Sequence, residues 1–396
     1  MTREYKFYAP TQILVGTDTR MQIPEILKNK GYERICVVTG KHVSKTKPFR
    51  VFMEQMQQVY KECVIFDDTM PDPTVDSTNR AAGFLKKTKS EAVVAVGGGS
   101  CIDTAKAMCM LATNEGSIRD YLFGGSKMIA AAPLPLICVP TTAGSGSEVT
   151  ASSVITDEEN QIKLSVTHTL LLPQIAVIDP VMHMEMPSGI TASTGMDALT
   201  HAIEAYTSLN ANPLSDMYAE NAIRMIGQSI RTAVWKPFDL EARTAMAQAA
   251  LLGATAFVQA GLGAVHGIAQ SMGGIAHTAH GVSNAVLLPH VMEVNLPGCI
   301  DKYAHIAELL NAAKTGMTQR EKAQQAIEEI REINRDIRIP ETIGQMGVKR
   351  EMFSAITEGT MGYRLLAVNP VKIREEDVYY ILENAMTGGN TDGNEI

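Results

Sequence analysis

The sequence predicts a two-domain protein in which a doubly wound α/β domain precedes an all-helical domain. Short apolar runs alternate with helical patterns over the first 185 residues, whereas Ala-rich and Met-rich helical patterns dominate from Pro187 onward. The chain has 396 residues, which is more than the roughly 250–300 residues at which one hydrophobic core usually stops growing. We therefore expect two domains, residues 1–185 and residues 186–396.

Five apolar runs in the first part predict the strands of a parallel sheet. They are nearly continuous, which is typical of strands that are buried on both faces. Helical patterns lie between them at residues 50–58, 75–87 and 102–111, and two further runs at 152–156 and 161–166 predict an appended hairpin around Asp157-Glu158-Glu159-Asn160. The expected strands are residues 35–38, 63–66, 92–96, 136–139 and 175–178.

The second part contains no apolar run of comparable quality. Helical spacing is clearest at residues 245–260, 323–333 and 376–386, and the Gly- and Asn-containing end at 387–396 predicts a loose tail. This half is therefore expected to be helical.

Composition narrows the classes of partner. The net charge is −8 and no dense Lys/Arg run occurs, which argues against nucleic acid or an anionic membrane as a partner. The six cysteines form no C-x-x-C pair and are interpreted as reduced core residues. The first residues lack the apolar stretch of a signal peptide, and no run approaches the ~18 apolar residues of a membrane span, so we expect a cytoplasmic protein that acts on small molecules.

A glycine-rich loop, residues 97–100, follows one expected strand and precedes a helical pattern. Gly97, Gly98, Gly99 and Ser100 would let the backbone approach a phosphate group, and the helix that carries Asp103 in its first turn would offer free amides to the negative charge. The usual G-x-G-x-x-G pattern is absent because Ile102 occupies the third glycine position. On this loop alone, a tight turn without a ligand is equally compatible.

A second loop, residues 140–148, favours the phosphate interpretation. It also follows an expected strand, and Thr141, Thr142 and Ser145 could contact the phosphates, the ribose or the nicotinamide carboxamide of the same ligand. Loops after two parallel strands meet at the carboxyl edge of the sheet, where open α/β folds bind ligands. Together the two loops favour a dinucleotide.

The end of the expected strand at 35–38 bears on the choice of dinucleotide. NAD sites commonly place a carboxylate there, whereas a 2′-phosphate needs room and positive charge. This chain has Gly40 followed by Lys41, Lys45 and Lys47. The pattern favours NADP(H) over NAD(H), with a merely solvated Lys-rich loop as the alternative.

One carboxylate and three imidazoles predict a metal site. Asp197 and His201, four residues apart, fall on one face of an expected helix, and His266 and His280 follow among Gly, Ala and Ser residues. An isolated D-x-x-x-H pair would more often be a structural hydrogen bond. Small, apolar surroundings suit a metal pocket, and a mixed nitrogen and oxygen set favours iron or zinc over magnesium or calcium.

These segments together resemble the iron-dependent, group III alcohol dehydrogenase family. Residues 97–106 match G-G-G-S-x-x-D-x-A-K, residues 140–150 match P-T-T-A-G-[ST]-G-S-E-V-T, and Asp197, His201 and the block 261–289 match two metal segments. The agreement in order and spacing covers nearly the whole chain. The resemblance implies a Rossmann-like first domain, an all-helical second domain as in dehydroquinate synthase, a metal in the cleft between them, and a homodimer or higher homo-oligomer.

Carried over by position, the resemblance assigns the metal ligands and the cofactor contacts. It makes Asp197, His201, His266 and His280 the ligands, and it places the acidic residue that most often accompanies NAD at Gly40, in agreement with NADP(H). Its cofactor contacts fall on Gly97, Gly98, Ser100, Thr141, Thr142 and Lys163.

One position departs from the family pattern. Many members carry a histidine four residues after the third ligand, often assigned to proton relay, and here that residue is Gln270. A neutral amide cannot act as a general acid in that way. His277, which many members lack, is the candidate for this role or for shaping substrate specificity, and a hydrogen bond to one of the metal ligands is its alternative role.

The expected activity is reversible reduction of a small aldehyde to a primary alcohol, with a nicotinamide as hydride donor and a metal that polarises the carbonyl. One alternative is a lyase similar to dehydroquinate synthase, which would need a Lys/Arg cluster for a substrate phosphate that the ligand segments lack. A glycerol or hydroxy-acid dehydrogenase of the same superfamily is another. A non-catalytic, metal-stabilised binding protein is the last.

Overall fold

The computed structural model describes residues 4–159 and 162–388, and its contacts divide the chain into two compact units. The α/β unit comprises Ala9–Met186 and Phe238–Gln248. The helical unit comprises the segment up to Tyr8, Pro187–Pro237 and Ala249–Ile396. The expected domain boundary at residue 185 stays a prediction, and the sequence pattern gave no sign that short segments of the chain change unit.

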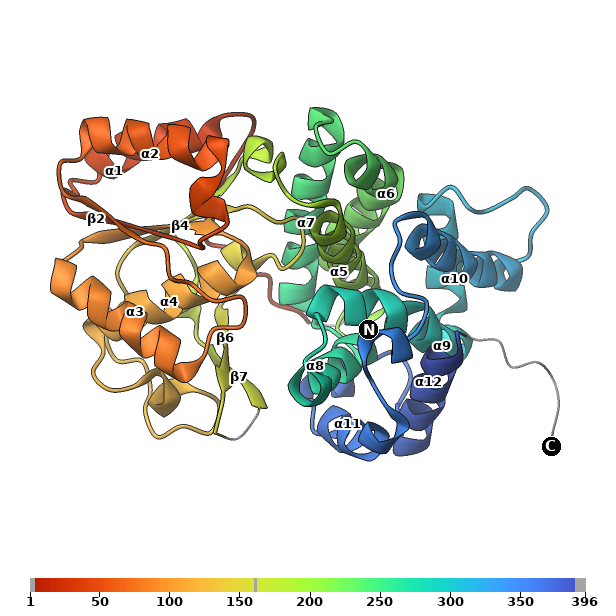
Figure 1. The fold of residues 1–396 in the computed structure, drawn as a ribbon. Helices are drawn as coiled ribbons and strands as arrows, with labels where there is room; N and C mark the ends of the chain where they lie inside the picture. The colour runs from red at the N-terminus through yellow and green to blue at the C-terminus, as the bar shows by residue number, and fades with distance from the viewer. Residues whose placement is uncertain (1–3, 160–161, 389–396) are drawn as a thin grey trace. The chain divides into compact units, whose positions relative to one another are not determined.

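A six-stranded, all-parallel sheet forms the centre of the α/β unit (Figure 1), in the order β1-β8-β5-β4-β2-β3. The five expected strands are present, and the sixth, β1, was not predicted. It is a short edge strand with mostly exposed side chains. The strands are β1 (Gln12–Val15), β2 (Ile35–Thr39), β3 (Cys63–Phe66), β4 (Ala92–Gly97), β5 (Leu136–Pro140) and β8 (Ile175–Ile178).

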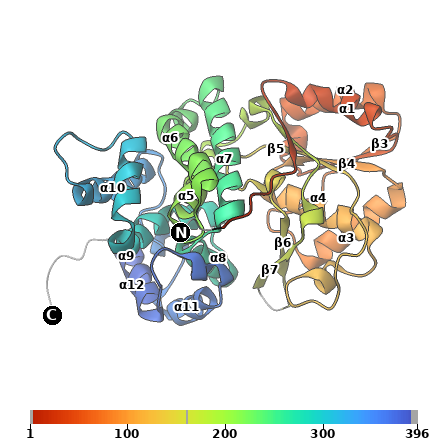
Figure 2. The same cartoon turned by 180° about the vertical axis from the view of Figure 1, so that it is seen from behind.

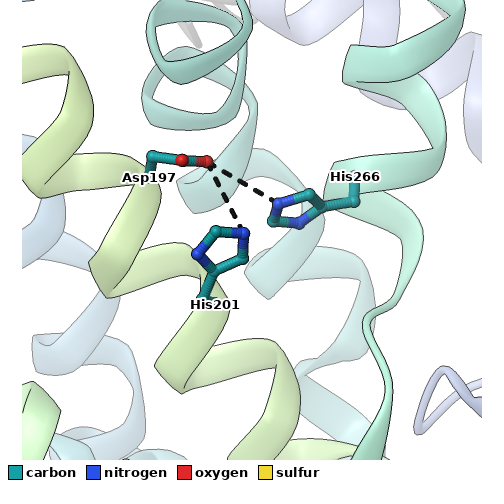
Figure 3. A group of neighbouring side chains, drawn as sticks. All are labelled: Asp197, His201 and His266. Carbon is teal, nitrogen blue, oxygen red and sulfur yellow. Dashed lines mark ion pairs between the residues drawn. The ribbon is translucent and has the colours of Figure 1, made fainter. Parts of the chain in front are cut away.

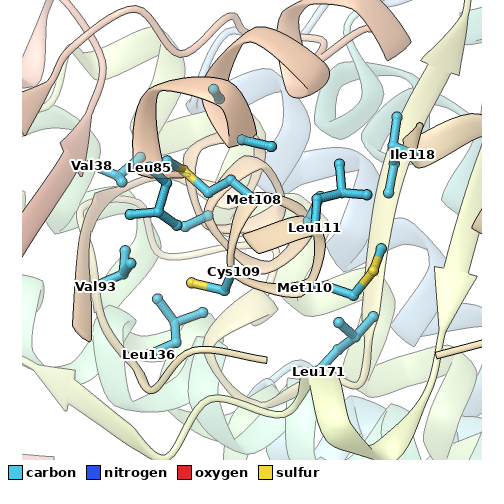
Figure 4. Packing of buried hydrophobic residues seen from close by; sticks show 14 of the residues in the cluster. Val38, Leu85, Val93, Met108, Cys109, Met110, Leu111, Ile118, Leu136 and Leu171 are labelled. Atoms are coloured by element: carbon cyan, nitrogen blue, oxygen red, sulfur yellow. The ribbon is translucent and has the colours of Figure 1, made fainter. Parts of the chain in front are cut away.

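Helices cover both faces of this sheet, because successive strand side chains point to opposite sides. Val37 of β2 belongs to the core on the face of α1 and α2, and Val38 belongs to the core on the face of α3 and α4 (Figure 2; Figure 4). The expectation of burial on both faces is wrong for β3, where Ile65 is 38% exposed because the strand lies at the sheet edge. The helices are α1 (Ile23–Asn29), α2 (Lys47–Val59), α3 (Val75–Thr88) and α4 (Gly99–Thr113).

The appended hairpin is present as β6 (Ser152–Asp157) and β7 (Ile162–Thr167), which pair antiparallel from Ser152 with Thr167 to Asp157 with Ile162. Residues 160 and 161 of the expected turn lie outside the described residues. All six cysteines are free, and five of them are buried. Their interpretation as reduced residues is confirmed, although Cys63 is only half-buried.

The helical unit contains no strand among its described residues. The helical patterns at 323–333 and 376–386 fall within α10 and α12, and the pattern at 245–260 falls within α7, which the division between the units crosses. The helix α12 is followed by Gly388, whose φ of 71° suits a glycine C-cap, and the rest of the expected tail lies outside the described residues. The helices are α5 (Ser188–Thr207), α6 (Pro213–Trp235), α7 (Leu240–Ala260), α8 (Ala264–Ala276), α9 (His280–Leu309), α10 (Gln319–Asp336), α11 (Phe353–Met361) and α12 (Glu375–Thr387).

No single helix among the described residues has the length and apolar composition needed to cross a membrane. The helices α7 and α8 meet that requirement only as a pair, by length and composition, and they are bent by 101° at the break between them.

Candidate metal centre and cofactor loops

The helix α5 places Asp197 and His201 one turn apart, and both side chains are buried. The Nε2 atom of His201 lies 3.8 Å from Oδ1 of Asp197. This is too long for the direct hydrogen bond that would explain the pair as purely structural. The separation instead leaves room for an atom between the two groups.

The other two predicted ligands come from α8 and α9. His266, in the first turn of α8, is buried and its Nε2 lies 3.7 Å from the same Asp197 oxygen (Figure 3). His280 begins α9, and its Nε2 lies 3.6 Å from that oxygen, with 46% of the side chain exposed. One ligand atom from each of Asp197, His201 and His266 lies within 4.8 Å of the other two.

These separations fit a bound cation. Four ligands at bond lengths of about 2.1 Å around a tetrahedral ion are about 3.4 Å apart, close to the spacings between Asp197 and the imidazoles. The buried Asn284 amide marks the point of convergence, because its Nδ2 lies 2.7 Å from Asp197 Oδ1 and 3.1 Å from Nε2 of both His266 and His280. Three imidazoles and a carboxylate suit iron or zinc.

Glu204, which was not predicted, contacts the His266 imidazole on the side away from Asp197. The Nδ1–H of His266 donates to Oε2 of Glu204 at 2.6 Å, and the backbone N–H of Val265 donates to Oε1 at 2.7 Å. Both Glu204 and His266 are buried. A signal was present in the sequence, since Glu204 lies on α5 one turn after His201, as in D-x-x-x-H-x-x-E.

The electrostatics of the set favour a cation. Burial alone would raise the pKa of Asp197, but the nearby His201, together with His266 and His280, holds it well below its usual range. For His266, burial lowers the pKa, but Glu204 and Asp197 outweigh it and raise the pKa to about 9. A metal ion therefore competes with a proton for Nε2 of His266, while Nδ1–H stays bonded to Glu204.

The two residues considered for proton transfer lie at different places on α8. Gln270 is half-buried and one turn after His266, whereas His277 is exposed and ends the helix with a φ of 54°. Their roles in catalysis stay predictions.

The two loops that are predicted to bind the cofactor, residues 97–100 and 140–148, lie side by side in the α/β unit. Gly97, the last residue of β4, pairs with Pro140, the last residue of β5. A Cβ at Gly98 would lie 3.2 Å from Thr142, and a Cβ at Gly99 would lie 2.7 Å from Oγ of Ser145, so glycine is what allows the loops to touch. No side chain caps the N-terminus of α4, whose first amides can face an anion.

These loops adjoin the point between β2 and β4 at which the order of strand addition in the sheet changes direction. The chain leaves β2 for β3 on one side and leaves β4 for β5 on the other, while β2 and β4 are neighbours. Ligands of doubly wound folds bind outside the carboxyl ends of strands at such a point.

The remaining predicted cofactor residues have protein partners. The hydroxyl of Ser100 donates to the carbonyl of Pro71, and Nζ of Lys163 lies 2.5 Å from Asp72. Asp103 is buried, and its carboxylate accepts the N–H of Val154 at 3.1 Å, an anchor between α4 and β6.

A carboxylate near Gly40 was also missed. Gly40 forms an isolated bridge with Asp68, which lies just beyond β3, and Lys41 Nζ is 2.9 Å from Asp68 Oδ1. Asp68 could not be placed from the sequence because it reaches this edge from a different strand.

Comparisons with known proteins identify the family of the chain. The sequence model of the iron-containing alcohol dehydrogenase family matches residues 10–180, and that of the Fe-containing alcohol dehydrogenase family, C-terminal, matches residues 191–386. Long-chain-alcohol dehydrogenase 1 of Geobacillus thermodenitrificans is 38% identical over 92% of each chain. NAD-dependent methanol dehydrogenase of Bacillus methanolicus is 33% identical over 96% of this chain and 99% of its own.

Solved structures of the same kind superpose closely. A structure of 1,3-propanediol oxidoreductase has a TM-score of 0.93 at 35% identity and covers 97% of this chain and 100% of its own. Sulfoacetaldehyde reductase from Bifidobacterium kashiwanohense in complex with NAD+ has a TM-score of 0.87 at 26% identity, covering 98% of this chain and 100% of its own. The relatives are dehydrogenases and reductases, which decides against the lyase and binding-protein alternatives. The chain belongs to the iron-containing alcohol dehydrogenase family, and it is a metal- and nicotinamide-dependent alcohol dehydrogenase.

Proposed function

We propose that the protein interconverts a small aldehyde and its primary alcohol, with ferrous iron held by Asp197, His201, His266 and His280. The convergence of these four side chains on one point carries the proposal. A bound divalent cation supplies a Lewis acid that polarises the carbon–oxygen bond of the substrate. The first loop and the N-terminus of α4 hold the pyrophosphate of the nicotinamide cofactor.

Iron is the proposed metal because the ligand set is rich in imidazole and because the family is named for iron. Zinc satisfies the same donors. Activity measured after anaerobic loading with ferrous iron and, separately, with zinc separates the two, and higher turnover with zinc would contradict iron as the catalytic metal.

The test of the reaction uses His266→Ala and a matched histidine variant, His305→Ala. His305 is partly exposed and contacts Glu308, outside the ligand set. With a panel of small aldehydes and NADH or NADPH, we expect cofactor oxidation in the wild type and in His305→Ala and none in His266→Ala. Full turnover of metal-free protein would refute the proposed role of the metal.

We further propose that the enzyme uses NADP(H) in addition to NAD(H). Gly40 carries no carboxylate that would repel a 2′-phosphate, and Lys41 beside it offers a positive charge. Asp68 beside Gly40 opposes this, because its carboxylate would repel a 2′-phosphate and already pairs with the ammonium group of Lys41. Values of kcat/KM for both reduced cofactors test the proposal, and undetectable turnover with NADPH contradicts it.

A homodimer is the proposed assembly, as the family resemblance implies. The edge strand β1 supports it, because within the described part of the chain it pairs on one side only, with β8, and an unpaired strand edge can pair with a second copy. Light scattering on the eluting protein measures the assembly, and a monomer at micromolar concentration would contradict it.

A further inference from the structure

We propose that Glu204 is a positioning residue of the metal centre, which fixes the ring and the tautomer of His266 and thereby strengthens metal binding. The inference rests on the proposed ligand set but not on the identity of the substrate. The carboxylate of Glu204 contacts the Nδ1 atom of His266 and the backbone N–H of Val265. It acts through the far nitrogen of His266.

Each carboxylate oxygen of Glu204 accepts one hydrogen bond from a neighbouring donor at the start of α8. Oε2 takes the imidazole Nδ1–H of His266, and Oε1 takes the backbone N–H of Val265. Gly263 permits the close approach, since a Cβ there would lie 3.0 Å from Oε1 of Glu204. The chain therefore holds the histidine and the backbone beside it against one rigid, buried carboxylate.

This contact has a defined chemical consequence. A proton kept on Nδ1 leaves the lone pair of Nε2 directed to the Asp197 oxygen and the Asn284 amide, where the ligands converge. A carboxylate behind a ligating imidazole fixes its orientation and increases its basicity, and loss of such a partner typically costs 10–100-fold in metal affinity.

A rival explanation is that Glu204 only caps the N-terminus of α8, where a negative charge is favourable in any case. The chain offers a matched control. Oδ1 of Asn369 accepts the N–H of Ala264 at 3.1 Å, at the same helix start, and its other contacts are with Asn295 and Val371 rather than with His266. Removing Asn369 thus weakens the helix start without removing the partner of the imidazole.

The decisive variant is Glu204→Gln. Val265 and His266 donate to different oxygens of Glu204, and a glutamine side chain has an oxygen at only one of these two positions, so in the present geometry one of the two donors then faces an NH₂ group. Glu204→Asp is the second variant. It keeps the charge and two acceptor oxygens but shortens the side chain by one methylene group, so that both contacts become longer.

The experiment measures zinc affinity by competition with a chromophoric chelator, and thermal unfolding of the metal-free proteins. We expect Glu204→Gln to weaken zinc binding about 10–100-fold, and Glu204→Asp to weaken it less. Asn369→Ala should lower the Tm and leave the zinc affinity unchanged. If Glu204→Gln does not fold, the zinc affinity of Glu204→Asp tests the proposal in its place.

Two results would overturn the proposal. One is wild-type zinc affinity in the folded Glu204 variants, and the other is an equal loss of affinity in Asn369→Ala, which would trace the effect to the helix start. Because the readout is metal binding, an inactive wild-type enzyme with this pattern would contradict only the proposed reaction. Normal turnover of the wild type with unchanged affinity in Glu204→Gln would contradict only the role of Glu204.

Discussion

Gly281 provides the sharpest test of how the metal centre is assembled. It follows His280 in the first turn of α9, and a Cβ at this position would lie 2.5 Å from the carbonyl oxygen of Ser193 and 2.9 Å from its carbonyl carbon. Both atoms belong to the backbone of α5, the helix that carries Asp197 and His201. They cannot turn away as a flexible side chain would. The substitution Gly281→Ala must therefore separate the start of α9 from α5.

The size of that movement follows from the contact. A carbon atom normally stays about 3.4 Å or more from such an oxygen, so the helix start must withdraw by about 0.9 Å. The distance of 3.6 Å between Asp197 Oδ1 and His280 Nε2 would change by a similar amount, whereas ligand distances tolerate only about 0.2 Å. Overpacking of this kind costs about 1–3 kcal/mol, and 1.4 kcal/mol corresponds to tenfold in affinity.

We expect Gly281→Ala to lower the Tm of the metal-free protein and to weaken zinc binding by about tenfold or more. The control is Gly83→Ala, in the exposed middle of α3, where a Cβ would meet no atom within 4 Å. That substitution should stabilise the protein by about 0.5–1 kcal/mol and leave the zinc affinity unchanged. Wild-type stability and zinc affinity in Gly281→Ala would refute the reasoning, because they would mean that α9 does not pack this closely on α5.

Three further predictions concern pH, cofactor and metal. Burial, with Arg243 nearby, lowers the pKa of His183 to about 4, whereas the pKa in the unfolded state is about 6.5. The unfolded state therefore binds the proton more readily, and the free energy of unfolding should fall by about 2 kcal/mol from pH 7 to pH 5. Urea unfolding should show a smaller loss in His183→Gln, and an equal loss would contradict this assignment. Asp68→Asn should free Lys41 from its ion pair and raise kcat/KM for NADPH relative to NADH, and Lys41→Ala should lower this ratio. An unchanged ratio in both variants would exclude the ion pair as a determinant of cofactor choice. Zinc at about 100 times its Kd should stabilise the wild type by about 2.7 kcal/mol, and His201→Ala should lose most of that gain in thermal unfolding. The same gain in His201→Ala would mean that His201 is not a ligand.

The sequence was informative wherever the information is local. The strands before Gly97 and Pro140 could be predicted because apolar runs mark buried parallel strands, and the four proposed ligands could be named because their residue types and spacing form motifs. The strand β1 was missed because its apolar run, Ile13-Leu14-Val15, is only three residues long.

Contacts between distant segments of the chain could not be predicted from the sequence. Glu204 lies one turn after His201, but its partner His266 is 62 residues further along the chain, and nothing in the local pattern says which residue the carboxylate will meet. Asp68 is similar, because its position beside Gly40 depends on the parallel pairing of β2 and β3. The order of strands in a sheet, rather than the chain around either residue, creates that neighbourhood.

The glycines around the histidines illustrate the difference between a pattern and its cause. Small residues beside His266 and His280 suggested a metal pocket because they leave space, but in the structure they let backbones approach. Gly263 admits the carboxylate of Glu204 and the amide of Asn369 to the start of α8, and Gly281 admits the backbone of α5 to the start of α9. The positions of the ligand atoms thus depend on how closely three helices pack, α5, α8 and α9. A methyl group at either glycine should therefore weaken metal binding, although neither glycine offers the metal a ligand atom.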